Sequence, residues 1–272
     1  MEEAFRANLT AGLEVGASCA VVVDGRLVVD LWGGTLDDTT GRAWGPDTLV
    51  DCRSATKGLT ATCLHVLVDR GLVDLDAPLR RYWPELRVDP TVRQALSHQA
   101  GIPIIDDLRP GAILDWDVMA SAIERQEPIA PIGAAPARDP GWQPELAGRM
   151  YAPVLPPLAP GMNSPAFRSA SIPVTGANGT ARAFAALYGE LARDGGRLVS
   201  PAVAHAMGEF EVDGVDAILG VPVGRTPGFE LTPPWETDHR PPHAFGCPSG
   251  GGVTFADPEA RLGFTTALYA AL

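Results

Sequence analysis

Lys57 is hard to explain as an ordinary surface charge. The chain has 272 residues and 21 basic side chains, and Lys57 is its single lysine among 20 arginines. Arginine can replace lysine wherever only a charge is needed, but its guanidinium cannot lose a proton near neutral pH. A solitary lysine in such a chain is therefore a candidate for a site that needs a neutral amine. A leftover surface lysine is the plain alternative.

Ser54 stands three residues before Lys57, at the start of a segment that predicts a helix over 54–70. Side chains three positions apart lie on one face of a helix, one turn from each other. The positive end of the helix favours a serine alkoxide and disfavours a lysine ammonium. A neutral amine at this spacing could accept the proton of the Ser54 hydroxyl, unless the pairing is a coincidence.

The helix predicted over 54–70 carries apolar side chains at Leu59, Cys63, Val66 and Leu67 and meets a glycine at position 71. This spacing predicts a stripe packed on the core. The four cysteines show neither a CxxC pair nor a short metal-binding spacing. We expect free thiols, with Cys19 and Cys63 buried in the core.

The remaining elements predict an α+β protein. Residues 2–12 predict a short helix, and strands over 18–23 and 26–32 flank an Asp24-Gly25 hairpin turn. Further strand candidates lie at the C-terminal end of the chain, over 217–223, 243–247, 251–256 and 261–269. We expect an antiparallel sheet with edges supplied by both termini, flanked by helices.

A proline-rich segment separates these two strand regions. Ten prolines between 128 and 165 exclude long helices there. We expect one domain over 1–272, with a sheet lobe over about 1–50 and 180–272. The second lobe, of helices and loops, spans about 54–175.

Five segments carry a family likeness: 47–61 with its Ser-Ala-Thr-Lys, 67–78, 96–103 with Ser-His-Gln-Ala-Gly, 177–182, and 255–259. Together they resemble the β-lactamase-related serine hydrolases. That family includes class C β-lactamases, DD-peptidases and the family VIII esterases. The likeness covers most of residues 5–125 and 165–268.

The resemblance implies a β-lactamase/transpeptidase-like fold with a reduced helical lobe. It implies Ser54 as the acylated nucleophile and Lys57 as its proton acceptor. It also implies an oxyanion hole from the Ser54 amide and an amide of a late strand, where Gly250 follows Cys247 and Ser249. We take these three residues as oxyanion or substrate-binding positions.

Two features depart from the family pattern. The family has a tyrosine in the helical lobe, and the stand-in here is Tyr151, inside the proline-rich segment. The family's late strand usually carries a basic or aromatic residue where this chain has Cys247. Without a cation to hold a carboxylate there, we expect poor turnover of penicillins.

Charge and composition limit the partners. The formal net charge of −12 repels nucleic acid and anionic membranes. The chain has no 18-residue apolar run, and its acidic start does not predict a secretory signal, so we expect a cytoplasmic protein. We expect no cofactor and no metal, and a small-molecule acyl substrate as partner. The sequence does not predict the oligomeric state.

The leading hypothesis is a serine hydrolase that cleaves an ester, thioester or amide through a Ser54 acyl-enzyme activated by Lys57. One alternative is an acyltransferase of a biosynthetic pathway, which passes the acyl group to an alcohol or amine. Another does without an acyl-enzyme: a cyclase, an isomerase or a binding protein that uses the reshaped cleft.

Overall fold

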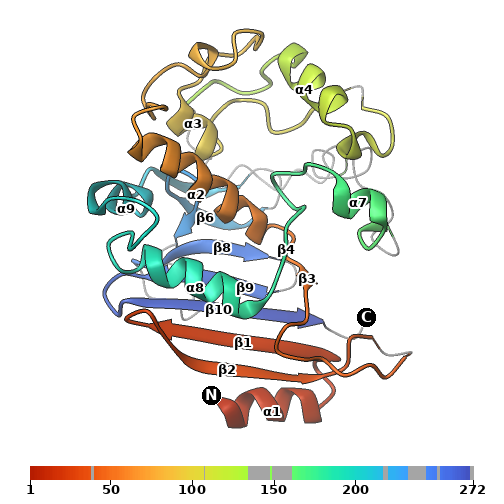
Figure 1. Cartoon of the computed structure of the whole chain (residues 1–272). Helices are drawn as coiled ribbons and strands as arrows, with labels where there is room; N and C mark the ends of the chain where they lie inside the picture. Colours follow the sequence, from red (N-terminus) through yellow and green to blue (C-terminus); the bar gives the residue numbers. More distant parts are fainter. Residues whose placement is uncertain are drawn as a thin grey trace.

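The computed structural model describes residues 1–37, 40–106, 108–133, 148, 161–216, 220–231, 243–249 and 252–269. The chain begins with a helix and two strands of one large sheet, continues through most of its helices, and then supplies the other six strands of that sheet (Figure 1). The helices are α1 Glu2–Thr10, α2 Ala55–Asp69, α3 Val92–Leu96, α4 Trp116–Arg125, α7 Pro165–Ser169, α8 Ala181–Leu191 and α9 Pro201–Met207, with 3-10 turns at Leu79–Arg81 and Ala112–Leu114. The strands are β1 Gly16–Val23, β2 Arg26–Gly34, β3 Val50–Asp51, β4 Asn178–Gly179, β5 Val212–Val215, β6 Pro222–Arg225, β7 Glu230–Leu231, β8 Phe245–Ser249, β9 Gly252–Asp257 and β10 Leu262–Tyr269.

The large sheet has eight antiparallel strands in the order β2-β1-β10-β9-β8-β7-β6-β5. The predicted hairpin joins β1 to β2, and both Asp24 and Gly25 have the positive φ that a type I′ turn requires. An α+β fold with an antiparallel sheet drawn from both termini is thus confirmed. The prediction that both termini supply the edge strands holds for β2 but is wrong for the C-terminal end. Strand β10 lies inside the sheet, and β5 forms the second edge.

Helix α8 covers one face of the sheet, where it packs on β10, β1 and β9 (Figure 1). The approach is close because two glycines face each other. A Cβ on Gly263 would overlap the backbone of Gly189, and a Cβ on Gly189 would lie 2.7 Å from Val22. This contact sets the height of α8 above the sheet, and α8 in turn supports α2.

Helix α2 packs on β8 and α9 and meets α8 where Gly58 faces Tyr188, and its buried face consists of small and polar residues (Figure 1). The prediction that the apolar stripe forms the buried face of this helix is wrong. Cys63 is exposed, Leu67 is 36% exposed, and Leu59 and Val66 are half-buried at the margin of the core. The helix passes too close to the layer beneath it for large side chains. The residues of α2 that are buried are Ala55, Thr56, Gly58, Ala61, Thr62 and His65.

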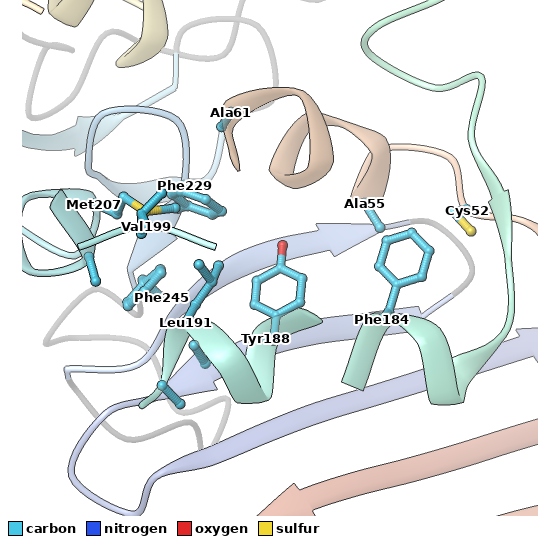
Figure 2. Packing of buried hydrophobic residues seen from close by; sticks show 13 residues of the cluster. Cys52, Ala55, Ala61, Phe184, Tyr188, Leu191, Val199, Met207, Phe229 and Phe245 are labelled. Atoms are coloured by element: carbon cyan, nitrogen blue, oxygen red, sulfur yellow. The ribbon is translucent and has the colours of Figure 1, made fainter. Parts of the chain in front are cut away.

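The core beneath α2 is built mainly by α8, α9 and β8 (Figure 2). Tyr188 and Leu191 rise from α8, and Phe229 and Phe245 meet edge to face at 5.2 Å between ring centroids. Cys19, predicted to be buried, is only 5% exposed in β1, whereas the prediction for Cys63 fails.

The strand predicted over 217–223 is displaced in the structure. β5 ends at Val215 and β6 begins at Pro222, while 217–219 lie outside the described residues. The other late strands, predicted over 243–247, 251–256 and 261–269, correspond to β8, β9 and β10 with shifts of up to two residues. Among the residues described, no helix is both long and apolar enough to cross a bilayer.

Candidate active site

A two-stranded sheet fixes the chain that leads into α2. β3 pairs with β4, and the Cys52 amide donates a hydrogen bond to the carbonyl of Ala177 at 2.9 Å. Arg53 then adopts a positive φ of 43°, and its amide donates to the Asp51 carboxylate at 2.9 Å. This tight bend directs the chain into the helix and places Ser54 at its N-cap position.

The Ser54 hydroxyl does not cap the helix. Serine at an N-cap usually accepts a hydrogen bond from a backbone amide of the first turn. Here the backbone of Ser54 is already helical, and its Oγ lies 2.7 Å from Lys57 Nζ. Both residues are half-buried, so the pair is reachable from solvent and shielded on one side. The structure therefore brings together the two residues that the sequence singled out.

The backbone amide of Ser54 donates to no group of the described residues. It lies at the N-terminal end of the 15-residue helix α2, where the helix dipole favours negative charge. An amide in this situation can stabilise an oxyanion that forms beside Ser54 Oγ.

Two side chains of β8 hold the segment around Ser54 in place. Cys247 Sγ donates to the Ser54 carbonyl at 2.8 Å, and Ser249 Oγ donates to the Cys52 carbonyl at 3.1 Å. The two residues alternate along the strand and so point to the same face. Cys247 and Ser249, two of the three predicted oxyanion or substrate-binding residues, thus lie at the site, but their side chains hold the backbone carbonyls on either side of Arg53.

The Cys247 thiol is protonated. Burial, and then the negative charge of Glu230, raises the pKa of the Cys247 thiol to about 11, although Lys57 opposes the shift. A neutral thiol can donate the hydrogen bond to the Ser54 carbonyl. The position therefore contributes no positive charge to the site.

An open cavity of about 200 Å³ lies on the Lys57 side of Ser54. Its apolar wall comes from α2, the end of α3, the 173–174 segment and the turn before β7. Its lining includes Lys57, Ala61, Leu96, His98, Pro173, Val174, Arg225, Phe229, Glu230 and Cys247.

The charge of Arg225 in this cavity is compensated. Its side chain is only 5% exposed and donates to Asp216 at 2.9 Å and to Glu230 at 3.0 Å. Two carboxylates hold one guanidinium, so Arg225 is not free to bind an anionic substrate. Nothing in the sequence distinguishes this arginine from the other 19, which is why sequence analysis missed it.

His98 also lines the cavity and is accessible to solvent. Desolvation against the cavity wall, and then the positive charges of Arg225 and Lys57, lower the pKa of His98, while Asp216 acts in the opposite direction. The imidazole is therefore neutral over the physiological pH range.

Two predicted site residues, Tyr151 and Gly250, lie outside the described residues. Gly250 directly follows β8 in the sequence. Tyr188 is fully buried in the core, and its hydroxyl has no hydrogen-bond partner among the residues that the structure describes. In the same part of the chain, no group of three or more histidine, cysteine or acidic side chains could hold a metal ion.

Known proteins are similar to this chain in both sequence and fold. Residues 3–137 match the family model described as Beta-lactamase. The Esterase/beta-lactamase LipL of Mycobacterium tuberculosis (strain ATCC 25618 / H37Rv) is 38% identical over 117 residues. That match covers 42% of this chain and 27% of LipL, so the chain spans about a quarter of that relative's length.

Solved structures extend the likeness to the whole chain. A family VIII carboxylesterase is 30% identical with a TM-score of 0.84, and the match covers 100% of this chain and 91% of that one. A penicillin-binding protein homologue from Caulobacter crescentus is 27% identical with a TM-score of 0.83, covering 98% and 90% of the two chains. With the Ser-x-x-Lys pair at the start of α2, these likenesses show that the chain belongs to the β-lactamase-related serine hydrolase family.

Proposed function

We propose that this protein is a serine hydrolase that cleaves carboxylic esters through an acyl-enzyme on Ser54. The observation that carries the proposal is the 2.7 Å separation between Lys57 Nζ and Ser54 Oγ, beside an open cavity. A hydroxyl is a weak nucleophile until a neighbouring base takes its proton, and Lys57 is the base within reach. The names of the esterase relatives support the same reaction class.

The reaction balances with these two side chains and one water molecule. Lys57 takes the Ser54 proton while Oγ attacks the ester carbonyl carbon, and the resulting oxyanion is stabilised by the Ser54 amide. The tetrahedral intermediate then expels the alcohol, which leaves with the proton held by Lys57. Water, deprotonated by Lys57, attacks the acyl carbonyl in turn, and Ser54 regains its proton as the carboxylic acid leaves.

The charges of the site favour neutral esters over penicillins. A penicillin carries a carboxylate, and one lysine and one arginine line the described part of the cavity. Lys57 is occupied by Ser54 and Arg225 by two carboxylates, while Cys247 is an uncharged thiol. An anionic substrate would therefore meet no available cation among these residues.

Turnover of p-nitrophenyl acetate and of penicillin G tests the proposal. We expect kcat/KM for the ester to exceed that for the penicillin by at least about tenfold, and Ser54→Ala to abolish ester turnover. Penicillin hydrolysis as efficient as ester hydrolysis would contradict the substrate class. Ester hydrolysis that survives in Ser54→Ala would contradict the acyl-enzyme.

A further inference from the structure

His98 occupies a backbone position that favours glycine. Helix α3 ends in a Schellman motif, in which the His98 amide donates to Ala95 at 3.3 Å and the Gln99 amide donates to Gln94 at 2.7 Å. The residue that follows the C-cap of such a motif takes a left-handed conformation, and His98 has a φ of 62°. Glycine adopts this conformation without strain, whereas a side chain with a Cβ is disfavoured there.

The His98 side chain does not compensate this cost through a contact with the protein. No described residue forms a hydrogen bond with the imidazole. The ring lines the cavity beside Lys57, Leu96 and Phe229, and it remains accessible to solvent. A strained residue whose polar atoms are unused and open to a cavity is a candidate for ligand contact.

We propose that His98 is a specificity-determining residue, which hydrogen-bonds a neutral polar group of the ester bound in the cavity. The inference rests on the proposed ester hydrolysis. It extends that proposal by naming the substrate class: esters that carry a hydroxyl or similar uncharged polar group on the part that enters the cavity.

The surroundings of His98 explain why the recognised group is neutral. Desolvation in the cavity is the main cause that lowers the pKa of His98, and among the charged groups Arg225 and Lys57 act in the same direction while Asp216 opposes them. A neutral imidazole offers one N–H donor and one lone pair, which suits a hydroxyl on either side. It offers no positive charge to a carboxylate, and the apolar wall around Ala61 and Phe229 disfavours a charged substituent.

The position allows a substitution that removes the side chain without threatening the fold. His98→Gly deletes the imidazole and installs the residue that the Schellman motif prefers, so its melting temperature should equal or exceed that of wild type. Asp194→Gly is the matched control, because Asp194 also has a left-handed φ of 56°, is exposed and does not line the cavity.

The test compares esters that differ by one hydroxyl. One pair is p-nitrophenyl butyrate and p-nitrophenyl 3-hydroxybutyrate, and the other is ethyl butyrate and 2-hydroxyethyl butyrate. We expect wild type to prefer the hydroxylated ester of at least one pair in kcat/KM. His98→Gly should reduce that preference about three- to tenfold, the effect of one neutral hydrogen bond, while Asp194→Gly leaves it unchanged.

The outcomes separate the two proposals. A preference that changes less than twofold in His98→Gly for both pairs would overturn the role of His98 and leave the hydrolase intact. A wild-type protein that hydrolyses none of the four esters would overturn the proposed function and this inference with it. His98→Asn, which tolerates the left-handed backbone and keeps hydrogen-bonding atoms, should restore part of the preference.

Discussion

The Ser54 side chain stands where a helix normally uses its serine as a cap, yet its Oγ is paired with Lys57. The carbonyl of the same residue is held from β8 by Cys247. Backbone and side chain of the nucleophile are therefore fixed by different partners. This arrangement leaves the hydroxyl oriented for attack without using it to stabilise the fold.

The role of Lys57 can be tested by comparing arginine with alanine at that position. Arginine keeps the positive charge and approximate length but cannot accept a proton, so Lys57→Arg should lose almost as much acylation rate as Lys57→Ala. General-base catalysis accounts for about 10²–10⁴-fold in rate, which is the expected loss for both variants. Acylation is followed by the burst of p-nitrophenol, with thermal melts to confirm folding. An arginine variant close to wild type would mean that Lys57 acts only as a cation.

At the level of elements, the distance between α2 and α8 depends on one small residue. A Cβ built on Gly58 would overlap the hydroxyl oxygen of Tyr188, which points from α8 toward α2 and is fully buried (Figure 2). With the hydroxyl removed, the nearest atom would be Tyr188 Cζ at 3.3 Å. The helix that carries Ser54 and Lys57 can lie this close to the core only because position 58 is glycine.

Gly58→Ala should therefore destabilise the protein by about 1–3 kcal/mol despite the higher helix propensity of alanine, because the buried ring cannot move away. Tyr188→Phe alone should be neutral or stabilising, since it removes a buried hydroxyl without a partner. In the double variant most of the loss should disappear. Urea unfolding of the four proteins measures this coupling, and additive effects of the two substitutions would contradict the steric explanation.

Some features of these elements were predictable from the sequence, and others were not. Ser54, Lys57 and the strands β1 and β2 were predictable because spacing and turn residues act locally. The buried face of α2 was not, because the apolar spacing of Leu59, Cys63 and Leu67 is a local signal, whereas the need for Gly58 and Ala61 comes from Tyr188 and β8, far along the chain. No pattern of residue types marked Arg225. His98 lies in the Ser-His-Gln-Ala-Gly segment of the family likeness, but that segment did not predict that its imidazole lines the cavity.

At the scale of the whole molecule, two neutral histidines link stability to pH. Burial lowers the pKa of His65 below its ordinary value of 6.5, and its Nε2 lies 2.8 Å from the Pro227 carbonyl. Desolvation in the cavity lowers the pKa of His98 in the same direction. In the unfolded chain both titrate near 6.5, so below that pH the unfolded state binds more protons than the folded state.

Stability should therefore fall as the pH is lowered from 7.5 to 5.5. The melting temperature measured at low salt should decrease over this interval, and the decrease should be smaller in His98→Gly, which lacks one of the two groups. A melting temperature that rises toward pH 5.5 would mean that protonated histidines are stabilised in the folded protein, against both shifts.

The most direct test of Ser54 as the nucleophile is the site of covalent labelling by a fluorophosphonate, read by intact mass and peptide mapping. We expect one adduct per chain on Ser54, no adduct in Ser54→Ala, and labelling slowed about 10²–10⁴-fold in both Lys57→Ala and Lys57→Arg. An adduct on any other residue, or labelling that persists in Ser54→Ala, would contradict the assignment of Ser54 as the nucleophile.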